Sequence, residues 1–148
     1  MSIKIRKLRK SDFKDLYGLG LEEWKGERWL TKQFLKETMK PPGYDYVACD
    51  GKKVVGGILV EVLDRPKMWI FFFVVGKKYR RQGVGSQLLK AVEKDCFKDF
   101  PLLFVDIGIN DIEGSNFYKK HGFKKQAEIK DWFDLGEAGI IYSKKLIK

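Results

Sequence analysis

The sequence predicts a single α/β (α+β) domain, with a mixed, mostly antiparallel central sheet of about seven strands and four helices. Residues 68–75 (MWIFFFVV) are apolar throughout, as expected for a central strand covered on both faces. Apolar residues then recur every four positions from Val84 to Cys96, which indicates an amphipathic helix. Another apolar strand follows at Leu102–Ile107, and a strand–helix–strand crossover makes these two strands parallel neighbours.

The first half of the chain predicts two helices and three further strands. Ser11 is the expected cap of the first helix, and a second helix is expected from Arg28 to Met39, where Pro41-Pro42-Gly43 ends it. An Asp50-Gly51 pair between two apolar runs predicts a tight hairpin. The strands expected before the central one are Ile3–Leu8, Tyr44–Cys49 and Lys53–Leu63.

The last third predicts one short helix and two closing strands. Glu113–Lys120 has the composition of a helix that ends at His121-Gly122. The strands expected after it are Phe123–Phe133 and Gly139–Leu146. With 148 residues and no linker-like segment, we expect one domain over 1–148.

Composition excludes several classes of protein. The longest apolar run has eight residues, whereas a membrane span needs about twenty. Two distant cysteines and one histidine provide no zinc or disulfide framework, so we expect no metal and a reducing, cytoplasmic location. The net charge of +10 is compatible with nucleic acid, an acidic partner or an anionic ligand. Because the lysines alternate with acidic residues, nucleic acid is the less favoured partner.

The segment 76–86 (GKKYRRQGVGS) lies directly between the central strand and the amphipathic helix. Unpaired backbone N–H groups at a helix start carry positive dipole ends, and glycines let a phosphate approach them closely. No G-K-[ST] follows, and Leu88 stands where a dinucleotide-binding motif has its third glycine. The segment therefore predicts a phosphate site of another kind.

This segment and 116–123 (NFYKKHGF) resemble the two signature regions of the GNAT superfamily of N-acetyltransferases. The resemblance implies transfer of acetyl from acetyl-CoA directly to a primary amine, by a monomer or homodimer. The acceptor is then a protein or peptide N-terminus, a lysine or a small amine. It also implies that the fourth and fifth strands, Met68–Val75 and Leu102–Ile107, splay apart.

The resemblance also implies which residues hold the coenzyme. Backbone amides of the turn bind the pyrophosphate, extended backbone on the central strand pairs with the pantetheine arm, and the N–H of Val75, at a bulge, faces the thioester carbonyl. Asn110 is the expected pantetheine ligand, and Asp111 the expected helix cap. The implied coenzyme residues of the strand and the turn are Phe73, Val74, Val75, Arg80, Arg81, Gln82, Gly83, Val84, Gly85 and Ser86.

The resemblance further implies that Tyr118 lies near the coenzyme sulfur and is the general acid. Many relatives carry a glutamate on the central strand, and this chain has none there. Asp106 and Glu61 are therefore both candidates for the general base. The amine acceptor is expected beside a set of acidic and aromatic residues: Glu22, Glu23, Trp24, Glu27, Trp29, Trp132, Phe133 and Tyr142.

Two other functions remain open at this point. Without a carboxylate on the central strand, the chain could be a sensor that binds acyl-CoA without turnover. Its positive charge is also compatible with a nucleic-acid or ribosome-binding module.

Overall fold

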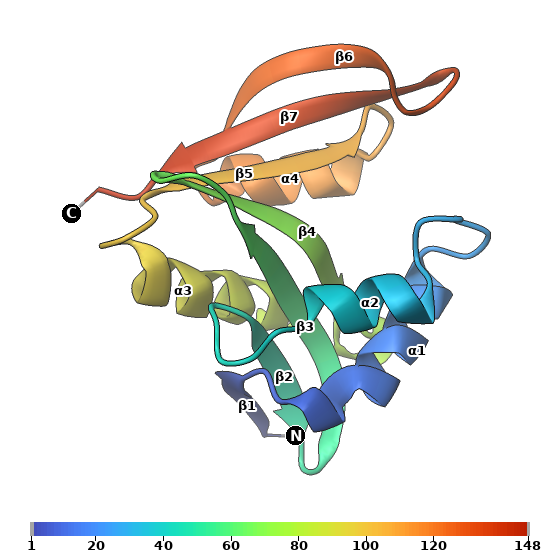
Figure 1. Cartoon of the computed structure of the whole chain (residues 1–148), viewed down its shortest axis with the longest axis vertical. Helices are drawn as coiled ribbons and strands as arrows, with labels where there is room; N and C mark the ends of the chain where they lie inside the picture. Colours follow the sequence, from blue (N-terminus) through green and yellow to red (C-terminus); the bar gives the residue numbers. More distant parts are fainter. Residues whose placement is uncertain (1, 148) are drawn as a thin grey trace. The chain divides into compact units, whose positions relative to one another are not determined.

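Seven strands form one sheet in the order β1-β2-β3-β4-β5-β7-β6 in the computed structural model, which describes residues 2–147 (Figure 1). The strands are β1 (Ile3–Lys7), β2 (Tyr46–Asp50), β3 (Lys53–Val62), β4 (Lys67–Val75), β5 (Leu102–Gly108), β6 (Lys124–Asp134) and β7 (Glu137–Lys145). The helices are α1 (Phe13–Glu23), α2 (Lys32–Thr38), α3 (Val84–Cys96) and α4 (Ile112–Lys120). The predicted fold class is confirmed, including the parallel pairing of β4 with β5 in an otherwise antiparallel sheet.

The chain divides into two compact units. The first comprises the chain up to Val60 together with Phe72–Asp95, and the second comprises Glu61–Phe71 and the chain from Cys96 onward. The turn at 76–86 belongs to the first unit, and Tyr118 and Asp106 belong to the second. The expectation of one domain over 1–148 stays a prediction.

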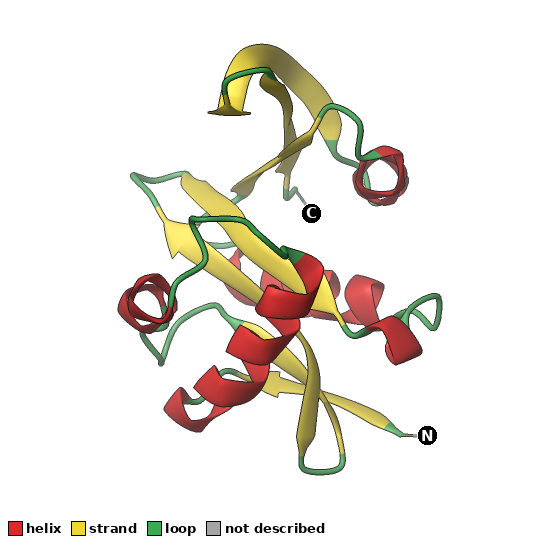
Figure 2. Ribbon diagram, turned by 90° about the vertical axis from the view of Figure 1, so that its right-hand side faces the viewer, coloured by secondary structure: helices red, strands yellow, loops and turns green. Residues whose placement is uncertain are grey.

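In the first unit, β2 and β3 form the predicted hairpin, whose tight turn lies at the bottom of Figures 1 and 2. Gly51 takes a φ of +61° in that turn, a conformation that favours glycine. Helix α1 packs closely on its unit, because a Cβ added at Gly20 would lie 2.8 Å from Leu30 and 3.1 Å from Phe72. Glycine at this position therefore lets α1 lie close to Phe72 of β4.

Both predicted helix starts in the first unit are wrong. A 3₁₀ turn at Lys10–Asp12 precedes α1, and Asp12, not Ser11, stands at the N-cap of that helix. Helix α2 begins at Lys32, four residues after the predicted Arg28, because the Thr31 side chain caps it by accepting the backbone N–H of Phe34 at 3.0 Å.

In the second unit, α4 packs on β7. The ring of Tyr118 stacks on that of Tyr142, with 6.4 Å between their centroids, and the Tyr142 hydroxyl donates to Ser115 Oγ at 3.0 Å. Strand β7 in turn pairs with β5 from Leu102↔Lys145 to Gly108↔Gly139. These contacts fix the position of α4 relative to β5 through β7.

Strand β4 is the fourth of seven in the sheet, as predicted, but its faces are unequal. Buried and half-buried residues alternate along its length, so the expectation that both faces are covered is wrong. Its ladder with β5 covers only Lys67–Ile70, opposite Leu102–Val105, which agrees with the splay that the resemblance implied. Among the helices of residues 2–147, none has the length and apolar composition needed to cross a bilayer.

Candidate functional site

The turn between β4 and α3 has an unusual backbone. Arg81 and Gly83 both take left-handed conformations, with φ values of +61° and +81°. A left-handed residue other than glycine costs about 1–2 kcal/mol, so strain is concentrated at Arg81. Arg81, Gln82 and Gly83 are exposed, and Val84 begins α3. The turn thus presents its backbone to solvent at the start of a helix.

Arg80 ties this turn to the rest of the first unit. Its Nε donates to the Val75 carbonyl at 2.8 Å, and its guanidinium forms an ion pair with Glu23 at the end of α1. Tyr79 donates to Asp50 Oδ2 at 2.8 Å. Glu23, an expected acceptor residue, is therefore an anchor of Arg80, and the expected contact of Arg80 with the coenzyme stays a prediction.

The other expected coenzyme residues of the first unit flank this turn. Phe73 and Val75 are half-buried and Val74 is buried at the end of β4. Val84 is buried in the first turn of α3, and Gly85 and Ser86 are half-buried. All of them, with the turn itself, lie in one unit of the fold.

Tyr118 lies inside the second unit, with 6% of its surface exposed. Its ring contacts Phe117 and Phe123 edge-on, at 5.3 Å and 5.1 Å between centroids. Burial raises the pKa of its phenol far above the usual range, and the charges of Asp111 and Asp106 raise it further. The hydroxyl therefore keeps its proton at neutral pH.

Asp106, on the half-buried face of β5, is held by two tryptophans. Trp69 Nε1 donates to its Oδ1 at 2.9 Å, and Trp132 Nε1 donates to its Oδ2 at 2.8 Å. The sequence interpretation placed Trp132 beside the acceptor and gave Trp69 no role, so it missed that the two meet at one carboxylate. The sequence carried no signal for this meeting, because it depends on the register that pairs Trp69 with Phe104, two residues before Asp106 on the same face.

Asp111 caps α4 by accepting the Gly114 N–H at 2.8 Å, so its predicted role is confirmed. The same contact explains why a glycine stands at position 114. A Cβ at Gly114 would lie 2.5 Å from Asp111 Oδ2, so the cap itself requires glycine. Asn110 is exposed, and its role as a pantetheine ligand stays a prediction.

The two candidate bases differ in their surroundings. Glu61 is exposed near the end of β3, whereas the carboxylate of Asp106 is half-buried, fixed by two donors and close enough to raise the pKa of Tyr118. The charge of Asp106, and not that of Glu61, is thus among the causes of the raised pKa of Tyr118.

The expected acceptor residues separate into two groups. Trp24 is a packing residue in the first unit, in edge contact with Trp29 and Phe72 at 5.1 Å each. Tyr142, only 1% exposed, is a core residue of the second unit. Trp132 and Phe133 are 40% and 48% exposed on β6, so their side chains are accessible for contact with a ligand.

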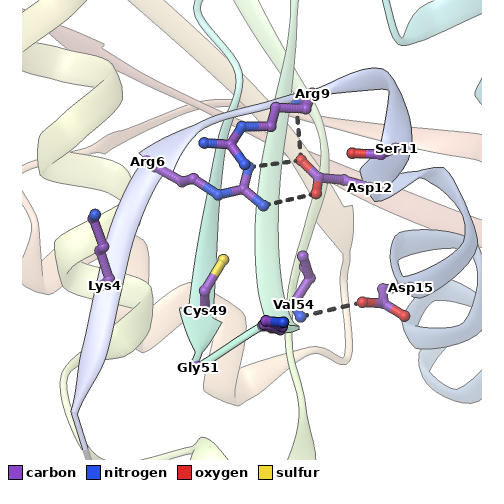
Figure 3. A pocket seen from close by; sticks show the side chains of 10 residues that line it. Lys4, Arg6, Arg9, Ser11, Asp12, Asp15, Cys49, Gly51 and Val54 are labelled. Atoms are coloured by element: carbon purple, nitrogen blue, oxygen red, sulfur yellow. Dashed lines mark hydrogen bonds and ion pairs between the residues drawn. The ribbon is translucent and has the colours of Figure 1, made fainter.

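A hollow of about 390 Å³ lies elsewhere in the first unit, beside β1 and the start of α1 (Figure 3). Two of its charges are paired, because the Arg6 guanidinium donates to both oxygens of Asp12 at 2.9 Å, and Asp15 accepts the Val54 N–H. It contains none of the expected site residues. Within residues 2–147, no three metal-ligating side chains gather in one place.

Comparison with known proteins gives consistent results. A model of the acetyltransferase (GNAT) family matches residues 5–123. Ard1 from Thermoplasma volcanium is similar over 100% of both chains, with 21% identity and a TM-score of 0.91. The ribosomal-protein-S18-alanine N-acetyltransferase from Escherichia coli has 16% identity and a TM-score of 0.86, over 99% of this chain and 96% of that chain.

Naa50 from Arabidopsis thaliana, in complex with the bisubstrate analogue CoA-Ac-MVNAL, has 20% identity and a TM-score of 0.82. The similarity covers 98% of this chain and 99% of that chain. At these identities, the three structures share the fold.

Proposed function

Because this chain belongs to the acetyltransferase (GNAT) family, we propose that it transfers the acetyl group of acetyl-CoA directly to a primary amine. The observation that carries the proposal is the turn before α3, where Arg81 and Gly83 take left-handed conformations. Strain of this kind persists where a ligand-binding role maintains it. The bound CoA analogue of the Naa50 structure supports the same coenzyme class.

The residues of the turn fit an anionic ligand. A Cβ at Gly83 would have no atom within 4 Å, so the space over this backbone is open for a phosphate. We assign the pyrophosphate to the amides of Gln82 to Ser86, with Arg80 and Arg81 near its charges. Phe73, Val74, Val75 and Asn110 are assigned to the pantetheine arm. When bound, acetyl-CoA supplies the activated acetyl thioester.

The second unit supplies the proposed chemical groups. The amine nitrogen bonds to the acetyl carbonyl carbon, the carbon–sulfur bond breaks, and the leaving thiolate takes up a proton. Tyr118 is the proposed donor, because burial keeps its phenol protonated. Because the pKa of the phenol is raised, complete transfer of its proton to the thiolate costs free energy. The proton that the amine loses must therefore reprotonate the phenol within the same turnover. Asp106 is the proposed acceptor of that amine proton.

The acceptor is proposed to be a peptide or protein N-terminus, ahead of lysine side chains and small amines. Two similar structures support this order, because the protein from Escherichia coli is named a ribosomal-protein-S18-alanine N-acetyltransferase and the protein from Arabidopsis thaliana holds the bisubstrate analogue CoA-Ac-MVNAL. A cytoplasmic location is part of the proposal. It is supported by Cys49 and Cys96, which are free and buried thiols.

The test begins with coenzyme binding, by calorimetry and by thermal stability with saturating acetyl-CoA. We expect micromolar binding and a higher Tm. Screening peptides, polyamines, amino acids and aminoglycosides for acetylation by mass spectrometry then identifies the acceptor. A flat melting response with no heat of binding removes the proposal. Binding without acetylation of any amine identifies a sensor instead, and salt-sensitive retention of RNA identifies a nucleic-acid module.

A further inference from the structure

We propose that Trp132 determines amine specificity: its indole N–H occupies Asp106 Oδ2 in the free protein, and the ammonium group of the acceptor replaces it there. This inference rests on the proposed acetyl transfer to an amine. It names the contact that recognises the amine, and the residue that must yield before the amine can bind.

One of the two donors to Asp106 is firmly held. Trp69 lies in the part of β4 that is paired with β5. Its ring also stacks on Phe104, with 5.9 Å between centroids and 7° between planes. A side chain fixed by both a ladder and a stacked ring keeps its hydrogen bond to Oδ1 while the site is used.

The other donor, Trp132, is held less firmly than Trp69. Trp132 lies on β6 between Ile129 and Asp134, where the register of the β6–β7 ladder is interrupted. Asp131, next to it, takes a left-handed φ of +55°. Trp132 is also 40% exposed. Its indole can therefore leave Oδ2 without breaking a paired stretch of the sheet.

Gly139 on β7 provides the place where this indole rests. A Cβ at that position would lie 2.5 Å from Trp132 Cδ1 and 2.8 Å from its Cγ. Glycine weakens a strand, and here it is required for the ring of Trp132 to lie against β7. The position of the Trp132 ring in the free protein thus depends on β6, which carries it, and on Gly139 of β7, which leaves room for it.

The exchange selects for a specific chemistry. An indole is a neutral donor with one N–H, whereas an ammonium has three N–H donors and a positive charge. A charge-assisted hydrogen bond to a carboxylate is about twice as strong as a neutral one. An ammonium can displace the indole, whereas an alcohol lacks the charge and a quaternary ammonium lacks the N–H. The amine binds in this form before it loses the proton and attacks.

The direct test follows the indole N–H signals of the four tryptophans by ¹H–¹⁵N NMR, assigned with Trp69→Phe and Trp132→Phe. Butylammonium chloride is the probe, and butan-1-ol and tetramethylammonium chloride are the matched controls. We expect butylammonium to move the Trp132 signal much further than the Trp69 signal, and the controls to move neither. No shift of Trp132, or equal shifts with tetramethylammonium, overturns the exchange.

Kinetics provides a second test once an acceptor is known. Without a competing indole N–H, Trp132→Phe should lower KM for the amine roughly threefold to tenfold and leave kcat within twofold. Gly139→Ala displaces the intact indole and should lower KM likewise. Lys130→Ala, an exposed change on the same strand, should not alter KM. A merely structural role for Trp132 predicts the opposite sign, so a higher KM in both variants overturns the proposal.

The two tests separate this inference from the proposed function. Acetylation with an unchanged KM in Trp132→Phe and Gly139→Ala removes the exchange and leaves the function intact. The expected NMR response in a protein that acetylates no amine removes the function and leaves the exchange intact.

Discussion

Replacing Gly83 by asparagine separates coenzyme binding from folding. Gly83 has a φ of +81° and open space around its Cβ position. Asparagine tolerates the left-handed region better than other side chains, so the variant should fold, at a cost below about 1–2 kcal/mol. Its side chain nevertheless extends into the space proposed for a phosphate. Gly83→Asn should therefore fold normally and bind acetyl-CoA poorly.

The size of the effect can be worked out in advance. Acetyl-CoA at one hundred times its Kd stabilises the folded protein by about 2.7 kcal/mol. For a chain of this length, each kcal/mol shifts Tm by about 2–4 °C, so the wild-type protein should melt roughly 5–11 °C higher with the coenzyme. Gly83→Asn should lose most of this increase.

Gly26→Asn is the matched control, because Gly26 lies in the α1–α2 loop with a φ of +80° and also has open space around its Cβ position. This variant carries the same backbone strain away from the turn. It should show a similar small loss of Tm without ligand and keep the full increase with acetyl-CoA. If Gly83→Asn keeps the full increase as well, the coenzyme is not bound at this turn.

Four further outcomes are expected. Tyr118→Phe should keep acetyl-CoA affinity and lower kcat roughly tenfold to a thousandfold in stopped assays, since only a proton donor is lost; collapse of binding would make Tyr118 a packing residue. Asp106→Asn should lower kcat in the same assay, because the amine proton loses its acceptor, and Glu61→Gln should not; the reverse result would exchange their roles. Burial raises the pKa of Asp45 to about 6, so its contribution to stability is full below pH 4 and is lost as pH rises through 6. In urea unfolding, the free energy of unfolding of Asp45→Asn should therefore rise relative to that of the wild type by up to about 3 kcal/mol across that pH window. A constant difference between the two proteins at all pH values would contradict this. Asp111→Ala should cost about 1 kcal/mol in the same assay through loss of the α4 cap, and an unchanged midpoint would show that the cap contributes nothing.

The fold was predictable where a pattern repeats over many residues. The spacing of apolar residues in α3 and the uniform run of β4 identify a helix and a central strand, because each pattern is set by one element's own geometry. The Asp50-Gly51 turn was predictable because its backbone requires a left-handed residue. Helix starts were not, because Ser11 before α1 and Thr31 before α2 both have side chains suited to capping, and the chain uses only Thr31 in that way.

The site was predictable in its motifs and not in its contacts. The position of the turn between β4 and α3 follows from the order of elements, but the left-handed conformation of Arg81 does not, since arginine has no preference for it. The contacts of Asp106 span 37 residues to Trp69 and 26 residues to Trp132. Contacts at such separations depend on strand register, which no local pattern determines.

The absence of a glutamate from β4 can now be interpreted together with the Asp106 contacts. Family members often carry their carboxylate on that strand, and here Trp69 occupies its half-buried face. The ladder places Trp69 opposite Phe104, so Asp106 lies on the same face one step further along β5. We propose that Asp106 on the neighbouring strand takes the role of that carboxylate, and the indole of Trp69 on β4 holds it in place. This arrangement favours an active transferase over a coenzyme sensor, because a sensor has no need for a carboxylate oriented by two hydrogen bonds.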